Sequence, residues 1–306
     1  MASAPEVGCR LKFGLLLLCG ALCANATTYC VTLAGLGGEP DYEQRFNTWS
    51  KEIDQTLKSA GPDVKSEMLS GPNATKARFK AALETIARDA KPQDALVVML
   101  IGHGSFDGTD YKINIPGPDV SATELAAMLD RVPAGRQLVV NMTSASGGSV
   151  HALQKPNRTV ITATRSGSEK NATVFARYWV EALRDAAADT DKNEVITALE
   201  AFKYAEQKTK QFYDTQKRLS TEHASLDGGD QQGPLMAARF PLLRLGSIQM
   251  AAKDPAKQAL LARREDLEQK IDQLKFQKAA TPADEYKKQL SALLLELAKT
   301  QAELDQ

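Results

Sequence analysis

The fold is decided by the stretch ALVVMLIGHG at residues 95–104, in which an unbroken apolar run ends in His103 between two glycines. An apolar run without alternation is typical of a strand buried on both faces of a parallel sheet. Comparable β-branched or aliphatic runs, each bounded by turn residues, occur elsewhere in the chain. We predict strands at residues 29–35, 64–69, 95–102, 137–143 and 159–164.

Helical patterns lie between these runs. We predict helices over residues 41–59, 74–90 and 121–132, the last beginning with a capping box of Ser121 and Glu124. Residues 111–117 alternate in polarity and predict a small antiparallel excursion. Strands that alternate with helices indicate an α/β fold with a mostly parallel sheet flanked by helices. In such sheets the ligand site lies at the carboxyl ends of the strands, where His103 and the hydroxyls of TSASGG (143–148) fall.

The N-terminus has the pattern of a signal peptide. Arg10 and Lys12 precede an apolar run at 13–23, and ANA at 24–26 supplies a small-x-small cleavage pattern. We predict a signal peptide over residues 1–26 and export of the chain to the periplasm or the extracellular space. A lipoprotein and a retained anchor are the alternatives, although the run is short for a membrane span.

Charge and cysteine content limit the partners and the chemistry. Acidic and basic residues balance at 38 each, so we expect no nucleic-acid partner. Cys9, Cys19 and Cys23 lie in the predicted signal peptide, and Cys30 lies in the first predicted strand. The predicted mature chain therefore has no cysteine pair for an internal disulfide, and Cys30 fits a small buried apolar residue.

A block that ends in His-Gly, followed by a second block that ends in a hydroxyl and then Ser-Gly, resembles a known family. From about residue 28 to 245 the chain resembles the caspase and legumain-like cysteine peptidases (clan CD, C13-like), in their bacterial branch. Residues 160–183 and 221–230 resemble later segments of the same family. The resemblance implies a caspase-like fold, with His103 as general base and the Gly104 N–H as oxyanion donor. Ser144 stands where that family has its catalytic cysteine.

The family resemblance also places a substrate pocket. Met142 stands where relatives often carry a polar residue, and the loop with Arg165 and Ser166 borders the pocket. Arg165 could favour an acidic substrate side chain, although a charge on a loop is more often solvated.

Serine in place of cysteine leaves two hypotheses. A serine hydroxyl is a weak acid that must lose its proton to a histidine as it attacks, usually with an acidic residue orienting the imidazole. The first hypothesis is an exported, non-catalytic pseudopeptidase that binds a protein or peptide. The second is an active endopeptidase with Ser144 as nucleophile and His103 as general base. A carboxylate bonded to His103 would favour the second. Asp107 and Asp110 are the nearest candidates in sequence, but both lie in a predicted turn, where a solvated aspartate is ordinary.

A second motif has the spacing of a calcium loop. Residues 189–200 place oxygen-bearing groups at positions 1, 3, 5, 7, 9 and 12 of an EF-hand-like loop. They are Asp189, Asp191, Asn193, Val195, Thr197 and Glu200. Glu194 takes position six, where glycine normally supplies a left-handed turn. The alternative is that Asp189 and Asp191 simply begin the following helix; no other cofactor is expected.

The C-terminal segment differs in character from the rest of the chain. Leucines recur every seven residues at 260, 267 and 274, and again at 290, 297 and 304, on either side of AATPAD (279–284). We predict a domain over 27–250, with the loop as an insertion, and an antiparallel coiled-coil hairpin over 251–306. Residues 254–305 either fold back on the domain, self-associate or bind a partner.

Overall fold

The computed structural model describes residues 26–227 and 232–306. The predicted signal peptide lies outside these residues apart from Ala26. A six-stranded sheet in the order β10-β8-β7-β3-β1-β2 forms the centre of the molecule. Its strands are β1 (Thr28–Ala34), β2 (Val64–Leu69), β3 (Ala95–Ile101), β7 (Arg136–Asn141), β8 (Arg158–Thr162) and β10 (Ser225–Asp227). Five of these strands are parallel and correspond to the predicted ones, whereas β10 pairs with β8 antiparallel.

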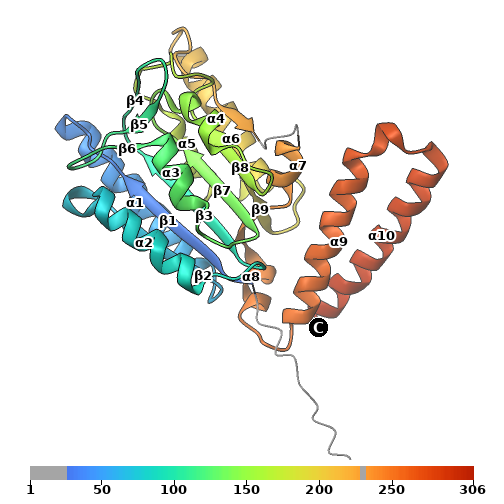
Figure 1. The fold of residues 1–306 in the computed structure, drawn as a ribbon. Helices are drawn as coiled ribbons and strands as arrows, with labels where there is room; N and C mark the ends of the chain where they lie inside the picture. Colours follow the sequence, from blue (N-terminus) through green and yellow to red (C-terminus); the bar gives the residue numbers. More distant parts are fainter. Residues whose placement is uncertain (1–25, 228–231) are drawn as a thin grey trace, which may run out of the picture.

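Helices cover both faces of the sheet (Figure 1). One core contains side chains of α1 (Pro40–Ala60), α5 (Phe175–Ala182) and α6 (Ala198–Thr215). The other contains side chains of α2 (Lys76–Asp89), α3 (Ala122–Leu129) and α4 (Val150–Leu153). Every residue of β3 is buried, since its side chains point alternately into the two cores. The predicted α/β sheet flanked by helices is therefore confirmed.

Shorter elements complete the domain. A three-stranded antiparallel sheet contains β4 (Gly104–Phe106), β5 (Tyr111–Ile113) and β6 (Val120–Ser121), which confirms the predicted excursion at 111–117. β9 (Val195–Thr197) pairs with β11 (Pro241–Arg244). The predicted capping box at Ser121 is present, and Thr197 and Glu200 form a second one at the start of α6.

Steric constraints explain why glycine stands on both sides of His103. Gly102 has φ +144°, and a Cβ there would lie 3.3 Å from Gly35 Cα at the end of the neighbouring β1. A Cβ on Gly104 would lie 2.5 Å from the Ser144 carbonyl oxygen and 2.6 Å from the Tyr111 ring. The chain can therefore turn sharply after β3 and pass close to the residues that follow β7.

The C-terminal helices form the predicted antiparallel pair (Figure 1). After α7 (Gly233–Ala238) and α8 (Gly246–Ala252) come α9 (Gln258–Phe276) and α10 (Ala283–Leu304). α9 packs on the domain, since the Arg239 guanidinium donates to the Gln269 carbonyl and Arg244 pairs with Glu265. The side chains of Leu267, Ile271 and Leu274 are buried, whereas Leu294 and Leu295 of α10 are 47% and 59% exposed.

Among the described helices, none combines the length and apolarity that a membrane crossing requires.

Candidate functional site

His103 lies directly beyond the carboxyl end of β3, half-buried against α1. Its ring makes edge contacts with Tyr42 and Phe46, at centroid distances of 4.9 and 5.3 Å. Nε2 lies 3.1 Å from the Gly37 carbonyl oxygen. A carbonyl can only accept a hydrogen bond, so Nε2 carries the proton in this contact, and in the neutral ring Nδ1 holds the lone pair.

Ser144 lies beyond the carboxyl end of β7, so the structure brings it beside the segment that follows β3. Its Oγ is 3.4 Å from the backbone nitrogen of Gly104, which donates to it. The residue is 2% exposed. Ala145 follows with φ +54°, and this left-handed residue turns the chain into the 3₁₀ turn Ser146–Ser149.

A buried network of hydroxyls and one amide holds the end of β7. The Tyr111 hydroxyl donates to Asn141 Oδ1 and lies 2.5 Å from Thr143 Oγ1. Burial raises the pKa of Tyr111 to about 12, so its hydroxyl remains a donor. Asn141 Nδ2 in turn donates to Ser149 Oγ. The backbone on both sides of Ser144 is thereby fixed by side chains from β5 and from the turn.

His103 has no acidic hydrogen-bond partner among the described residues. Neither Ser144 Oγ nor any carboxylate is hydrogen-bonded to His103 among residues 26–227 and 232–306. Asp107 is exposed and accepts the backbone N–H groups of Asp110 and Thr109, which lower its pKa. It therefore closes its own turn, as the turn interpretation predicts, and makes no hydrogen bond to His103.

The three predicted pocket residues lie in different surroundings. The Met142 side chain is 1% exposed and belongs to the core beneath the sheet, while its carbonyl accepts the Thr173 hydroxyl. Arg165 is exposed, and Ser166 Oγ lies 2.7 Å from Ser168 Oγ. Arg165 and Ser166 thus lie together on the loop after β8, whereas the Met142 side chain lies in the core and does not line a pocket with them.

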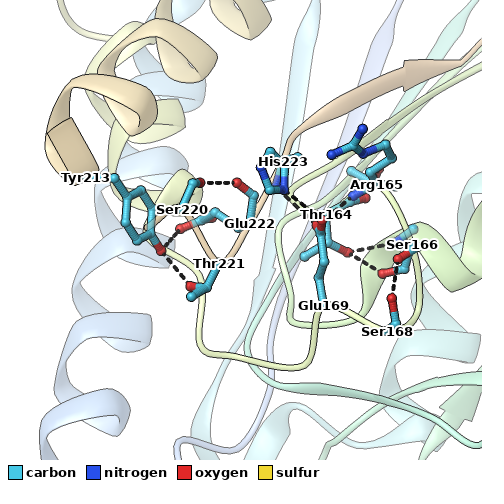
Figure 2. A network of polar contacts seen from close by, with 12 residues as sticks. Thr164, Arg165, Ser166, Ser168, Glu169, Tyr213, Ser220, Thr221, Glu222 and His223 are labelled. Carbon is cyan, nitrogen blue, oxygen red and sulfur yellow. Dashed lines mark hydrogen bonds and ion pairs between the residues drawn. The ribbon is translucent and has the colours of Figure 1, made fainter. Parts of the chain in front are cut away.

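Glu169 connects this loop to two others, and the sequence reasoning missed it (Figure 2). Its backbone carbonyl accepts the N–H of Ala145, next to Ser144. Its carboxylate accepts the backbone N–H groups of Arg165 and His223 and lies 2.7 Å from His223 Nδ1. His223 is exposed, and this carboxylate holds it through both the backbone and the ring. No sequence signal marks a contact between residues 54 positions apart.

A second carboxylate holds the segment that contains His223. Glu222 accepts the backbone N–H groups of Val174 and Phe175 at the start of α5. It also accepts the Tyr213 hydroxyl (Figure 2). Burial raises the pKa of Glu222, and these three donors oppose the shift. The loops around residues 165–169 and 219–223 are thereby fixed beside the Ser144 turn.

The 189–200 loop brings together three of its predicted ligands. Carboxylate oxygens of Asp189, Asp191 and Glu200 lie within 4.8 Å of one another. Burial raises the pKa of Asp191, and the charge of Glu200 raises it further. Asp189 and Asp191 do not begin the following helix, because α6 starts at Ala198 with Thr197 as its N-cap.

Glu194 adopts the left-handed conformation that position six of the loop requires, with φ +62°. Its carboxylate accepts the Ser247 hydroxyl and the Ile248 N–H at the start of α8. A non-glycine residue with this backbone conformation is strained. The two hydrogen bonds of the Glu194 carboxylate, which glycine could not make, offset that strain.

Comparisons with known proteins give a likeness of fold. No protein-family model matches the sequence, and no curated protein matches it. Protein GSU0716 from Geobacter sulfurreducens is similar over 73% of this chain and 100% of its own, with 11% identity and a TM-score of 0.49. Caspase-1 from Spodoptera frugiperda is similar over 66% and 86%, with 15% identity and a TM-score of 0.46. The Drosophila initiator caspase Dronc is similar over 66% and 80%, with 11% identity and a TM-score of 0.42. At these values the likeness carries no argument about activity.

Proposed function

We propose that the protein is an exported, non-catalytic homologue of caspase and legumain-like peptidases that binds a protein or peptide segment. The observation that carries this proposal is the contact of the Gly104 N–H with Ser144 Oγ. A working oxyanion hole keeps such a donor free for the oxygen on which charge develops. Here the donor is directed at the hydroxyl that would have to attack.

The surroundings of the two side chains support the same proposal. Ser144 is 2% exposed, and the Nε2 proton of His103 is directed to a backbone carbonyl. A serine needs a hydrogen bond to its base and an orienting acid, whereas a thiol works with less. The bound segment would lie at the carboxyl ends of β3 and β7, beside the loop that carries Arg165 and Ser166.

Fluorophosphonate labelling tests the absence of catalysis. We expect the intact mass of the purified protein to stay unchanged after incubation with a fluorophosphonate. The Ser144→Ala variant, which lacks the hydroxyl, is the unlabelled reference. A covalent adduct on the wild type that is missing from the variant would contradict the proposal, because only an activated hydroxyl reacts in this way.

A peptide library tests the binding half of the proposal. We expect an immobilised library to retain the wild type and to retain Arg165→Glu less well. Arg184→Glu is the matched control, since Arg184 is also exposed and pairs with Glu52 away from this loop. Retention of no peptide by the wild type would contradict binding.

The alternative function is hydrolysis, and one observation favours it. Because Nε2 carries the proton, the lone pair on Nδ1 is available to accept a proton from Ser144 as its oxygen attacks a carbonyl carbon. The Gly104 N–H would then have to release Ser144 Oγ and bind the developing oxyanion. The labelling experiment distinguishes this function from the first.

Export is proposed on the N-terminal pattern alone. N-terminal sequencing of protein recovered from the periplasm or the medium is expected to begin at Thr27. Recovery of the full-length chain from the cytoplasm would contradict export.

We also propose that the 189–200 loop binds calcium. The convergence of Asp189, Asp191 and Glu200 supports this, since a set of hard oxygen donors suits this ion. Asn193 and the Val195 carbonyl would complete the ligand set. The bound ion would neutralise the carboxylates and hold the loop.

A thermal shift with calcium alone tests this site. We expect calcium chloride to raise the Tm of the wild type and to leave that of Glu200→Gln unchanged. Glu206→Gln, on the same helix, should respond as the wild type does. An equal shift in all three proteins would contradict a site at the loop.

A further inference from the structure

The ring of Phe106 occupies a slot between two glycines from different parts of the chain. A Cβ on Gly148 would lie 2.6 Å from Cδ2 of this ring, and a Cβ on Gly167 would lie 2.3 Å from Cδ1. Gly148 belongs to the 3₁₀ turn after Ser144, and Gly167 belongs to the loop after β8. Opposite edges of one ring therefore contact the two segments.

The ring, rather than the backbone, requires glycine at these positions. Neither Gly148 nor Gly167 has a positive φ, so the conformation of each is open to any residue. Distances of 2.3 and 2.6 Å are shorter than van der Waals contact, so any side chain at either position would displace the ring.

The slot is next to Ser144. Phe106 is the last residue of β4, whose first residue, Gly104, donates to Ser144 Oγ. Gly167 directly follows Arg165 and Ser166, the predicted border of the pocket. Phe106 is half-buried, and Ser144 is 2% exposed. The ring therefore lies between the turn that follows Ser144 and the loop that carries Arg165 and Ser166.

We propose that Phe106 is the residue that determines access to Ser144. With its ring in the slot the site is closed, and a ligand side chain enters only when the ring has left. That a ligand binds at this place rests on the proposed function. That the ring closes the site rests on the contacts of Phe106 with the two glycines.

Alkylation of a cysteine at position 144 measures access independently of binding or catalysis. The full chain with Ser144→Cys is incubated with iodoacetamide, with and without Phe106→Ala, and each cysteine is followed by peptide mass spectrometry. We expect Cys30, which is buried, to react slowly in both proteins. We expect position 144 to react at least about tenfold faster once the ring is removed, because a closed site reacts only on opening.

Two further variants make the result specific. Phe276→Ala removes an exposed ring on α9 and should leave the rate at position 144 unchanged. Phe106→Leu, which keeps an apolar side chain, should give an intermediate rate. Equal rates at position 144 with and without the Phe106 ring would overturn the proposal, and so would a parallel acceleration at Cys30, which indicates loosening of the whole fold. Failure to bind peptides would leave this result standing, so the two proposals fail separately.

Discussion

At the scale of single residues, the sequence predicts where His103 and Ser144 lie but not what each contacts. An apolar run that ends in Gly-His-Gly is sufficient to place the imidazole at the carboxyl end of a buried strand. The bond from Gly104 to Ser144 Oγ and the contacts of the Phe106 ring with Gly148 and Gly167 join residues about forty or more positions apart. Local patterns carry no information about such contacts.

The slot around Phe106 gives a prediction at this scale. We expect Gly167→Ala to lower the free energy of unfolding by about 1–3 kcal/mol, because the added methyl group overlaps the ring. Urea denaturation of the wild type and the variant measures this difference.

A double variant is the control for that prediction. In the Phe106→Ala background the same methyl group meets no ring, so Gly167→Ala should cost much less there. An equal cost in both backgrounds would show that Gly167 is required for a reason other than the ring.

At the scale of elements, caps and strand bounds follow from the sequence, whereas the docking of helices does not. Ser121 and Glu124 form a predicted capping box because both partners lie within one helical turn. Thr197 and Glu200 form another, so Glu200 serves both as a cap and as the last position of the acidic loop. The heptads predict two antiparallel helices but not that the buried Arg264 of α9 donates to the Asn193 carbonyl of that loop.

The contact between α9 and the loop predicts a pH dependence. Burial raises the pKa of Glu268 to about 7; Arg264 opposes the shift, and the charges of Asp191, Glu265 and Asp272 add to it. The folded state thus holds the Glu268 proton more tightly than the unfolded state does, whose pKa is ordinary. The stability from this group is fully present below pH 4.5 and is lost as pH rises through 7.

Glu268→Gln isolates this effect. We expect the variant to gain stability relative to the wild type as pH rises from about 4.5 to 7, since glutamine does not titrate. Chemical denaturation across that range, with the exposed Glu285→Gln as control, provides the measurement. A difference that stays constant with pH would contradict the raised pKa.

At the scale of the whole molecule, Arg244 connects two separate parts of the domain to the C-terminal helices. Arg244 of β11 pairs with Asp63, which precedes β2, and with Glu265 of α9. Its side chain is 20% exposed, and the two carboxylates raise its pKa against the effect of partial burial. Removing the guanidinium leaves two partly buried carboxylates without their cation, which is unfavourable.

Hydrogen exchange can localise the effect of this residue. We expect Arg244→Gln to speed exchange in α9 and α10 while leaving the amides of β3 and β7 protected, because the helices would loosen from an intact sheet. Arg263→Gln, which removes an exposed pair between α9 and α10, is the control. Uniform acceleration in the whole chain would contradict a local role.

The bond between Glu194 and the start of α8 has a mechanical consequence. The same small apolar cluster contains Val195 from the loop, Ile248 from α8, Leu261 from α9 and Leu304 at the end of α10. The cluster therefore joins the loop backbone to the base of both long helices, so packing at that base depends on the conformation of the loop. Loosening this junction would leave α9 attached to the domain through the contacts of Arg239 and Arg244, so the loop acts as one of several anchors of the helical pair.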